Sequence, residues 1–356
     1  MTLKWLEGRL AEIHRIEEYP KDTYPVERDE MVKLDSNENF FIPRGLYTKI
    51  WRELEEDLDP RLYPLNEEEE LINALSEYIA LPPECFVVGN GGDQIIETVV
   101  RAFVKGSERV LSLSPTFSMY RILTETHGNA YDSVPLGDGF ELDPDDLLSE
   151  VTPDTVLCFI CSPNNPTGNQ FDRRSVMNVV KEFKGIVIVD EAYVEFAPYS
   201  VKDAVEEYDN LVVVRTLSKA FGLAGLRVGY GIACPKIASA LRHILLSYNV
   251  SKVSLRLASK VLERREFFLP SIDRIKDERY RLAKRYDTMM GIKAFNSDAN
   301  FFLVETEKDV FTELRANRIF VRRVAIHDLG NCQRISVDLP EMNDRLLSVL
   351  EEVCDG

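Results

Sequence analysis

Up to about residue 250, short apolar runs rich in β-branched residues alternate with amphipathic stretches. The apolar runs predict buried strands, and apolar residues at helical spacing predict helices between them. We expect strands at 32–34, 85–88, 110–113, 156–160, 186–189, 211–214 and 228–233, and helices within 1–20, over 47–58, over 67–79 and around 95–103. The repeated order of strand, polar turn and helix predicts a mostly parallel sheet with helices on both faces.

The pattern changes in the last part of the chain. Long charged helices at 255–266 and 270–290 precede short strands at 299–304, 319–321 and 334–337 and a terminal helix over 340–353. Strands alternating with helices predict a second, smaller α/β lobe. We therefore predict an α/β protein with a large domain over 36–250, a small domain over 251–356, and an N-terminal segment, 1–35, that packs with the small domain.

Polar or aromatic residues follow the ends of several predicted strands. They are Gly91, Gly92, Phe117, Asn165, Asp190 and Lys219. Taken singly, each is typical of an ordinary turn, surface loop or core position. Parallel strands bring their carboxyl ends to one edge of the sheet, where open α/β sheets bind ligands. We therefore expect these residues to surround one site.

The segment from Thr216 to Gly229 carries the most specific chemistry. Ser218 and Lys219 follow the strand at 211–214, and Arg227 opens the next strand. A lysine can form a Schiff base with an aldehyde, while a serine and an arginine bind phosphate. A glycine-rich turn at 89–92 before a helix adds a second phosphate signal, and it lacks the dinucleotide pattern GxGxxG. Pyridoxal phosphate carries both an aldehyde and a phosphate.

Composition and charge argue against some classes of binding partner. The 356 residues are 45% hydrophobic and 29% charged, which is typical of a globular protein with a sizeable core. The net charge of -17 argues against nucleic acid and, more weakly, against an anionic membrane surface. No apolar run is long enough to span a membrane, and the amphipathic start differs from a signal peptide, so we expect a cytoplasmic protein.

Cysteine and histidine usage does not indicate a metal site. The six cysteines include one CxxC pair, Cys158 and Cys161, within an apolar strand run that turns alternate side chains to opposite faces. No second pair accompanies it, so buried thiols are the favoured interpretation. The four histidines are scattered along the chain.

Several segments, taken in order, resemble one enzyme family. GNGGDQIIE, PTFSMY, SPNNPTG, VDEAYVEF and TLSKAFGLAGLRVGY are similar to segments of the fold type I pyridoxal-phosphate aminotransferases, most closely the histidinol-phosphate aminotransferases. The likeness extends to KLDSNEN near the start and to ANFFLVE and RISVDLPEMNDRLL near the end, so it covers nearly the whole chain.

The resemblance implies a role for each matching residue. Lys219 matches the Schiff-base lysine and proton carrier, and Asp190 the partner that keeps the pyridine nitrogen protonated. Asn165 and Tyr193 match the groups that bond the ring hydroxyl, with Tyr193 also in the catalytic set, and Phe117 matches the stacking aromatic. The phosphate site would be made of Gly91, Gly92, Asp93, Ser218 and Arg227, with Tyr63 reaching it from the neighbouring subunit of a homodimer.

The resemblance also implies substrates. Asn37 and Arg334 match positions near the amino and carboxyl groups, and a guanidinium pairs a carboxylate through two parallel hydrogen bonds. Arg322 matches an arginine that faces a substrate phosphate, although Arg323 lies beside it and alternate residues of a strand point oppositely. The implied reaction moves an amino group between histidinol phosphate and 2-oxoglutarate, with glutamate as the other amino compound.

Two departures from the family pattern lie near the expected substrate. Phe40, Phe41, Ile42 and Pro43 follow SNEN where a proline and a glycine are usual, and Asp338 with Leu339 replaces a glycine and a threonine, which predicts a lost cap before the terminal helix.

Three alternative functions follow from the same residues. One is an aminotransferase for aromatic or other amino acids, and a second is a decarboxylase of phosphorylated amino acids that uses the same cofactor residues. A third, a sensor domain fused to a DNA-binding module, is disfavoured by the acidic charge and by the lack of a spare domain.

Overall fold

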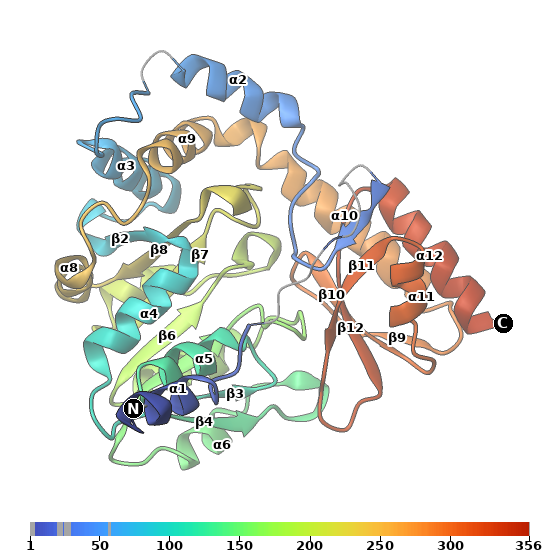
Figure 1. Cartoon of the computed structure of the whole chain (residues 1–356), viewed down its shortest axis with the longest axis horizontal. Coiled ribbons are helices and arrows are strands. Elements are labelled where there is room, and N and C mark those ends of the chain that lie inside the picture. Colours follow the sequence, from blue (N-terminus) through green and yellow to red (C-terminus); the bar gives the residue numbers. More distant parts are fainter. Residues whose placement is uncertain (1–3, 20–23, 25–29, 56–57, 356) are drawn as a thin grey trace.

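The computed structural model describes residues 4–19, 24, 30–55 and 58–355. Two sheets organise this part of the chain (Figure 1). The larger has seven strands in the order β2-β8-β7-β6-β5-β3-β4, and the smaller has five in the order β1-β11-β12-β10-β9. Each sheet has its own flanking helices, so the described chain forms two α/β lobes side by side.

The large sheet is mostly parallel, as predicted. Its strands are β2 (Phe86–Asn90), β3 (Arg109–Ser114), β4 (Ala130–Pro135), β5 (Thr155–Cys161), β6 (Ile186–Asp190), β7 (Leu211–Thr216) and β8 (Val228–Ala233). Strands β4, β3, β5, β6 and β7 run parallel, whereas β8 is antiparallel to both β2 and β7. The start of β8 therefore lies at the same edge as the ends of β2 and β7, and Arg227 joins the residues that follow the other strands.

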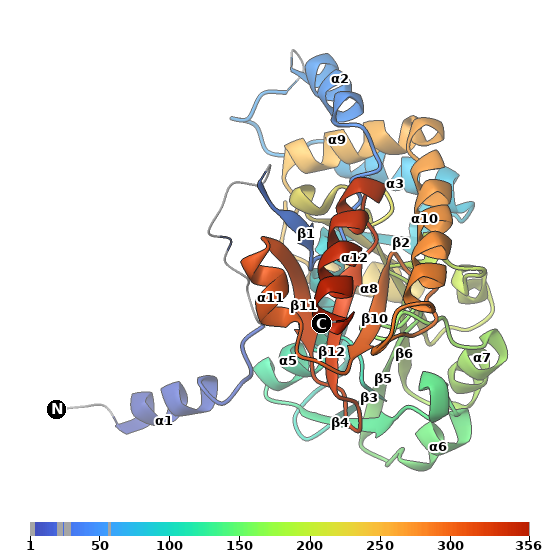
Figure 2. The same cartoon turned by 90° about the vertical axis from the view of Figure 1, so that its right-hand side faces the viewer.

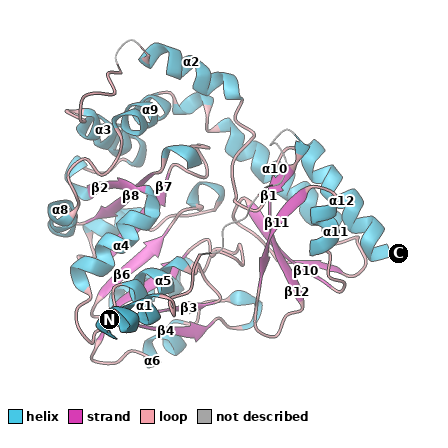
Figure 3. Cartoon of the chain, viewed as in Figure 1, coloured by secondary structure: helices cyan, strands magenta, loops and turns pink. Residues whose placement is uncertain are grey.

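Helices cover both faces of this sheet (Figure 3), which explains the unbroken apolar runs. Along β7, Val212 and Val214 belong to one buried cluster, while Leu211 and Val213 belong to the other. The flanking helices are α3 (Glu67–Ile79), α4 (Gly91–Phe103), α5 (Met119–Thr126), α6 (Pro144–Ser149), α7 (Arg173–Glu182) and α8 (Pro235–Ile244).

The small lobe combines both ends of the chain. Strand β1 (Val32–Leu34) pairs in parallel with β11 (Ile319–Val324). Strand β12 (Asn331–Ser336) is antiparallel to β11 and to β10 (Phe301–Thr306), which also pairs with β9 (Ile292–Ala294). The helices α9 (Lys252–Glu263), α10 (Pro270–Tyr286), α11 (Phe311–Ala316) and α12 (Pro340–Asp355) come from the C-terminal part, and α2 (Arg44–Leu54) packs on α9.

Helix α1 (Lys4–Ile13) stands away from both sheets (Figure 2) and has no buried residue. Beyond it, the ring of Tyr24 packs edge-on against Phe320 of β11, and its hydroxyl donates to Asp35 at 2.5 Å. These contacts agree with a segment that joins the small lobe. The domain boundaries at residues 36 and 251 stay predictions.

Some expectations from the sequence differ from the structure. Strands β4 and β9 were not expected, since β4 is an edge strand with mostly half-buried residues and lacks an apolar run. Helix α2 begins after Pro43 and ends at Leu54, several residues before the predicted end. Before α12, Asp338 Oδ1 accepts the N–H of Leu339 at 2.7 Å, and Asn343 Oδ1 accepts the N–H of Asp338 at 3.2 Å. Both N–H groups precede the first helical residue, Pro340, so the predicted loss of a cap stays a prediction.

The contact between β8 and α4 leads to a first prediction. A Cβ on Gly229 would lie 2.2 Å from the nitrogen of Gly92 and 2.3 Å from the carbonyl carbon of Gly91. Because both neighbours are backbone atoms, we expect Gly229→Ala to destabilise the fold by about 1–3 kcal/mol, measured by urea unfolding. Gly45→Ala is the control, since a Cβ there meets nothing within 4 Å. Equal stability of the two variants would contradict this packing.

Candidate active site

A cavity of about 470 Å³ opens at the edge of the large sheet and faces the small lobe. Its walls contain most of the residues that the sequence singled out: Gly92, Asp93, Phe117, Asn165, Asp190, Tyr193, Ser218, Lys219, Arg227, Arg322 and Arg334. The two arginines of the small lobe, from β11 and β12, are directly paired in the register of the sheet. Residues distant in sequence therefore meet in one place.

Lys219 lies three residues beyond β7 and is half-buried. Its Nζ donates a hydrogen bond to the carbonyl oxygen of Ser36 at 2.8 Å. Burial, followed by the positive charge of Arg334, lowers the pKa of Lys219 to about 8. A larger share of this amine is therefore neutral near pH 7 than for an ordinary lysine, as nucleophilic attack on a carbonyl requires.

Asp190 ends β6 and is buried among polar partners. The Tyr120 hydroxyl donates to Oδ2 at 2.7 Å, and the N–H of Ala192 donates to Oδ1 at 3.0 Å. Burial raises the pKa of Asp190 to about 6, against which both donors act. The carboxylate is thus mainly ionised at neutral pH and able to hold a cation inside the cavity.

An anion cradle lies at the first turn of α4. The early N–H groups of a helix have no intrahelical acceptor and attract negative charge. Arg227, in a left-handed conformation with φ of 51°, donates from Nη2 to Asp93 Oδ2 at 3.0 Å. A Cβ on Gly91 would come within 2.5 Å of that Nη2. Ser218 is fixed beside the cradle by Thr216, whose hydroxyl lies 2.9 Å from its Oγ.

Polar and aromatic side chains form another part of the cavity wall. Asn165 Oδ1 accepts from Nη1 of Arg334 at 2.8 Å, and the Tyr193 hydroxyl accepts from Nδ2 of Asn37 at 3.0 Å. Phe117 is half-buried and meets the edges of Tyr19 and Tyr120. Asn37 itself does not line the cavity and lies behind Tyr193.

The two neighbouring arginines of β11 point in opposite directions, as strand geometry requires. Arg322 lines the main cavity, and its guanidinium carbon lies 5.7 Å from the ring centre of Tyr19. Arg323 does not line that cavity and donates to Asp309 at 3.0 Å; both arginines border an adjoining cavity of about 390 Å³. Arg334 is only 6% exposed, and its Nε has no hydrogen-bond partner among the described residues.

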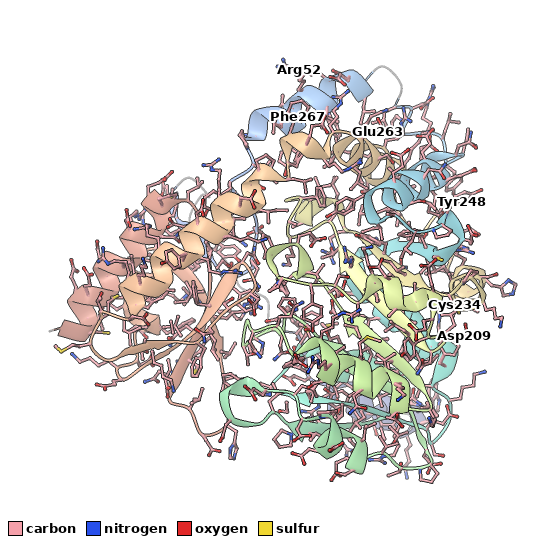
Figure 4. All side chains as sticks on the ribbon, turned by 180° about the vertical axis from the view of Figure 1, so that it is seen from behind. Arg52, Asp209, Cys234, Tyr248, Glu263 and Phe267 are labelled. Carbon is pink, nitrogen blue, oxygen red and sulfur yellow. The ribbon has the colours of Figure 1, made fainter. Side chains whose placement is uncertain are left out.

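Tyr63 and Gly91 also lie outside the walls of the main cavity. Gly91 sits directly behind Gly92, whereas Tyr63 is 71% exposed and stacks on Tyr248 with ring centres 4.6 Å apart. Figure 4 shows Tyr248 at the outer side of the large lobe. Within one chain, Tyr63 is therefore not part of the site.

Sequence reasoning missed three residues that shape the cavity. Tyr19 and Ser36 contribute a ring and a carbonyl, and Tyr120 bonds Asp190 from behind. The PTFSMY segment contains Tyr120, but nothing in the spacing shows that its hydroxyl points at β6. Only the packing of α5 on the sheet brings the two together.

A buried charge cluster underlies the same edge. Arg215 of β7 donates from Nε and Nη2 to Glu191 Oε2 at 2.9 and 2.8 Å, and its Nη1 lies 3.8 Å from Glu195 Oε1. The Glu195 side chain is 6% exposed, and neither oxygen accepts a hydrogen bond from the described residues. Burial raises the pKa of Glu195 to about 7, and the negative charge of Glu191 raises it further, while the charge of Arg215 acts in the opposite direction.

These residues fit pyridoxal phosphate as a group. The cavity places an amine with a lowered pKa, a buried carboxylate and a helix N-terminus with an adjacent arginine around one space. Gly91, with φ of 78°, has a backbone conformation that disfavours a side chain, and it lies against the guanidinium of Arg227. Among the described residues, no group of three His, Cys, Asp or Glu side chains is placed to hold a metal ion. None of the helices described is both long and apolar enough to cross a bilayer.

Comparison with known proteins agrees with this geometry. The family model for "Aminotransferase class I and II" matches residues 29–350. The chain belongs to this family. The predictions of an aminotransferase and of the fold type I architecture are thereby confirmed.

Individual relatives are similar over nearly their full length. The histidinol-phosphate aminotransferase of Ruminiclostridium cellulolyticum is 35% identical over 332 residues, which is 91% of this chain and 92% of the relative. That of Thermoanaerobacter sp. is 36% identical over 326 residues, or 90% and 92%. The crystal structure of the Sinorhizobium meliloti histidinol-phosphate aminotransferase, in complex with pyridoxal-5'-phosphate, superposes with a TM-score of 0.84 at 25% identity and covers 91% of this chain and 90% of that one.

The buried charge cluster leads to a second prediction. The pKa of Glu195 rises from 4.5 to about 7 on folding, so ionisation of Glu195 costs stability as pH increases through this interval. We expect Glu195→Gln to stabilise the protein by up to about 3 kcal/mol at pH 8 and to change little at pH 4.5, measured by urea unfolding. Glu207→Gln, at an exposed position, is the control. An Glu195→Gln effect that does not vary with pH would contradict the assignment.

Proposed function

We propose that this aminotransferase binds pyridoxal phosphate and transfers an amino group between histidinol phosphate and 2-oxoglutarate, with glutamate as the second amino compound. One observation carries the proposal: Lys219, Asp190 and the α4 cradle share a cavity with two arginines from the other lobe. When bound, pyridoxal phosphate supplies an aldehyde that joins amines and a ring that takes up electrons. The relatives at 35% and 36% identity support the choice of substrate.

Lys219 has two proposed tasks. Its amine, with the pKa lowered to about 8, attaches the cofactor covalently. With the cofactor bound, the same Nζ would also be the base positioned to take up and release the proton at the substrate carbon. The carbonyl oxygen of Ser36, which accepts from Nζ at 2.8 Å, keeps the amine at the cavity wall.

The other proposed cofactor residues bind and orient pyridoxal phosphate. Asp190 holds a proton on the ring nitrogen by charge, and Phe117 stacks on the ring. Asn165 and the catalytic-set residue Tyr193 bond its hydroxyl. The phosphate rests on the cradle, whose proposed members are Gly91, Gly92, Asp93, Ser218 and Arg227. Within it, Asp93 contributes by fixing the guanidinium of Arg227, to which it is bonded at 3.0 Å.

The substrate residues come mainly from the small lobe. We propose that Arg334 binds the α-carboxylate of glutamate, because its guanidinium is held rigidly by Asn165 and by the carbonyl of Asp35. Arg322 binds the phosphate of histidinol phosphate from the same face of the sheet. Asn37 acts near the substrate amino group through its bond to Tyr193. In a protein of net charge -17, these cations give anionic substrates a local site.

The assembly proposed is a homodimer with shared active sites. Exposed apolar residues gather around Tyr63 and its stacking partner Tyr248, with Leu62 and Leu65 beside them in the chain. Such a surface is typical of a subunit interface. We propose that a second copy packs on this surface and that Tyr63 reaches the phosphate end of the partner's cavity. The cytoplasmic location stays a prediction.

The covalent attachment is directly testable. We expect borohydride reduction of the holoenzyme, followed by peptide mapping, to locate the cofactor on Lys219. Lys219→Ala should still bind pyridoxal phosphate through the cradle but show no covalent label and no measurable turnover. Label on another lysine would refute the assignment of Lys219.

The substrate arginines can be separated by their half-reactions. Arg322→Ala should weaken histidinol phosphate by roughly 10- to 100-fold, because a charge-assisted hydrogen bond of about 1.5–3 kcal/mol is lost. Arg334→Ala should damage the glutamate half-reaction most, since histidinol phosphate lacks the α-carboxylate. Both half-reactions are followed by the cofactor spectrum.

Arg323→Ala is the matched control for Arg322→Ala, because the neighbouring side chain points away from the main cavity. Equal effects of the two variants on histidinol phosphate would contradict the proposed phosphate site. Conversion of phenylalanine or tyrosine without histidinol phosphate would overturn the proposed substrate and leave the cofactor chemistry in place.

The dimer leads to a prediction about Tyr63. We expect light scattering to give twice the 40.7 kDa chain mass, and Tyr63→Phe to raise the dissociation constant of pyridoxal phosphate several-fold without changing that mass. A monomer of full activity would rule out shared active sites.

A further inference from the structure

Tyr120 connects two of the proposed cofactor residues from behind the cavity. It lies at the start of α5 and is fully buried, with 0% exposure. Its ring stacks on Phe159 of β5 at 4.5 Å and 6°, and meets Phe117 edge-on at 5.6 Å and 87°. Its hydroxyl donates to Asp190 Oδ2 at 2.7 Å. One side chain therefore contacts both the proposed stacking ring and the proposed partner of the ring nitrogen.

We propose that Tyr120 is a positioning residue that holds Asp190 in the orientation and charged state needed to bind the cofactor ring nitrogen, while its ring sets the angle of Phe117. The proposal rests on the proposed function in one respect: Asp190 and Phe117 must be the cofactor contacts. Tyr120 does not line the main cavity, so it acts only through these two neighbours.

A purely structural role for Tyr120 does not account for its hydrogen bond to Asp190. A buried tyrosine in this protein does not need a hydrogen-bond partner, since the hydroxyls of Tyr230 and Tyr286 have none among the described residues. The carboxylate of Asp190, in contrast, accepts two hydrogen bonds from the described residues, and Tyr120 is the side-chain donor. Lys219, the cation of the same cavity, donates to Ser36 instead. The Tyr120 hydroxyl is therefore the side-chain donor on which the carboxylate depends, and it also interacts with the neighbouring thiol of Cys161.

The electrostatic surroundings make this donor important. The titratable groups that face Asp190 are Tyr120 from α5, Asp93 from α4, Cys161 from β5 and its neighbour Glu191. Burial raises the pKa of Asp190 first and most, the negative charges of Asp93 and Glu191 raise it further, and the bond from Tyr120 lowers it. Burial also raises the pKa of Cys161, so this thiol stays neutral near pH 7. Removal of the Tyr120 hydroxyl should therefore leave more of Asp190 protonated at neutral pH.

The sign of the pH effect follows from linkage. The pKa of Asp190 is about 6 in the folded protein and 3.8 ordinarily, so folding loses stability as pH rises between these values. In the Tyr120→Phe variant, the pKa of Asp190 in the folded protein is higher still, so the loss of folding stability continues above pH 6. The stability difference between wild type and variant should thus be small at pH 5 and larger at pH 8.

The experiment compares the full-length apoprotein, its Tyr120→Phe variant and Tyr286→Phe. The last removes a buried hydroxyl that bonds nothing among the described residues. We expect Tyr120→Phe to lower Tm by about 2–4 °C more at pH 8 than at pH 5. Tyr286→Phe should show the same small change at both pH values. A Tyr120→Phe effect that is equal at both would overturn the proposal.

A double variant tests whether Tyr120 acts through Asp190. In the Asp190→Asn background, which carries no charge, Tyr120→Phe should lose its pH-dependent effect on Tm. In the holoenzyme with intact Asp190, Tyr120→Phe should lower kcat on the order of tenfold at pH 7 and move the acid limb of the pH profile upward by roughly one pH unit. Persistence of the pH-dependent Tm effect in Asp190→Asn would overturn the proposal.

The two kinds of readout separate the proposals from each other. The Tm measurements on apoprotein do not depend on the substrate or the cofactor, so they test the Tyr120–Asp190 link alone. If Tyr120→Phe shows the expected pH-dependent Tm effect but leaves kcat and the pH profile of the holoenzyme unchanged, Asp190 is not the partner of the ring nitrogen. This result would overturn both this inference and that part of the proposed function.

Discussion

The close contact of β8 with the first turn of α4 is the constraint on which the active-site edge depends. Only hydrogen atoms fit between Gly229 and the backbone of Gly91 and Gly92. This contact sets the helix N-terminus directly beside Arg227, and β8 runs antiparallel to β7, so its start meets the end of the strand that leads to Lys219. The anion cradle and the reactive amine are thus fixed relative to each other by backbone packing.

Burial at this edge gives the site its chemistry. The same desolvation acts on both groups but in opposite directions, lowering the pKa of Lys219 to about 8 and raising that of Asp190 to about 6. Without its hydrogen bonds, the pKa of Asp190 would be higher still. The hydrogen bonds from the Tyr120 hydroxyl and the Ala192 N–H act against this rise in the pKa of Asp190. One cavity therefore holds a partly neutral amine and a mainly charged carboxylate.

The second lobe completes the cavity with cations. Arg322 and Arg334 are paired across β11 and β12, and therefore project from the same face of the small sheet. Strand β1 ties the segment before Ser36 into that sheet, while Ser36 bonds Lys219 of the large lobe. The walls of the proposed cofactor and substrate site thus come from different sheets, and the short chain between β1 and Asn39 crosses from one to the other. The proposed recognition of substrate therefore depends on how the two lobes are held together.

The sequence by itself determined the strands, their mostly parallel order and the residues at their carboxyl ends. These features follow from local periodicity and turn residues, because a short, unbroken β-branched run between turns favours a strand buried on both faces. The family resemblance added the roles of matching residues such as Asn165 and Arg227. The edge strand β4 escaped detection, since its half-exposed residues leave no such periodicity.

Only the tertiary structure decided which side chains meet. It turned Arg322 into the main cavity and Arg323 out of it, placed Asn37 behind Tyr193, and left Tyr63 on the surface beside Tyr248. It also brought Tyr120 to Asp190 and Glu195 to Arg215. Direction and burial depend on contacts between elements distant in the chain, and the pKa values of Lys219 and Asp190 follow from that burial. Spacing along one strand or helix carries no record of those contacts.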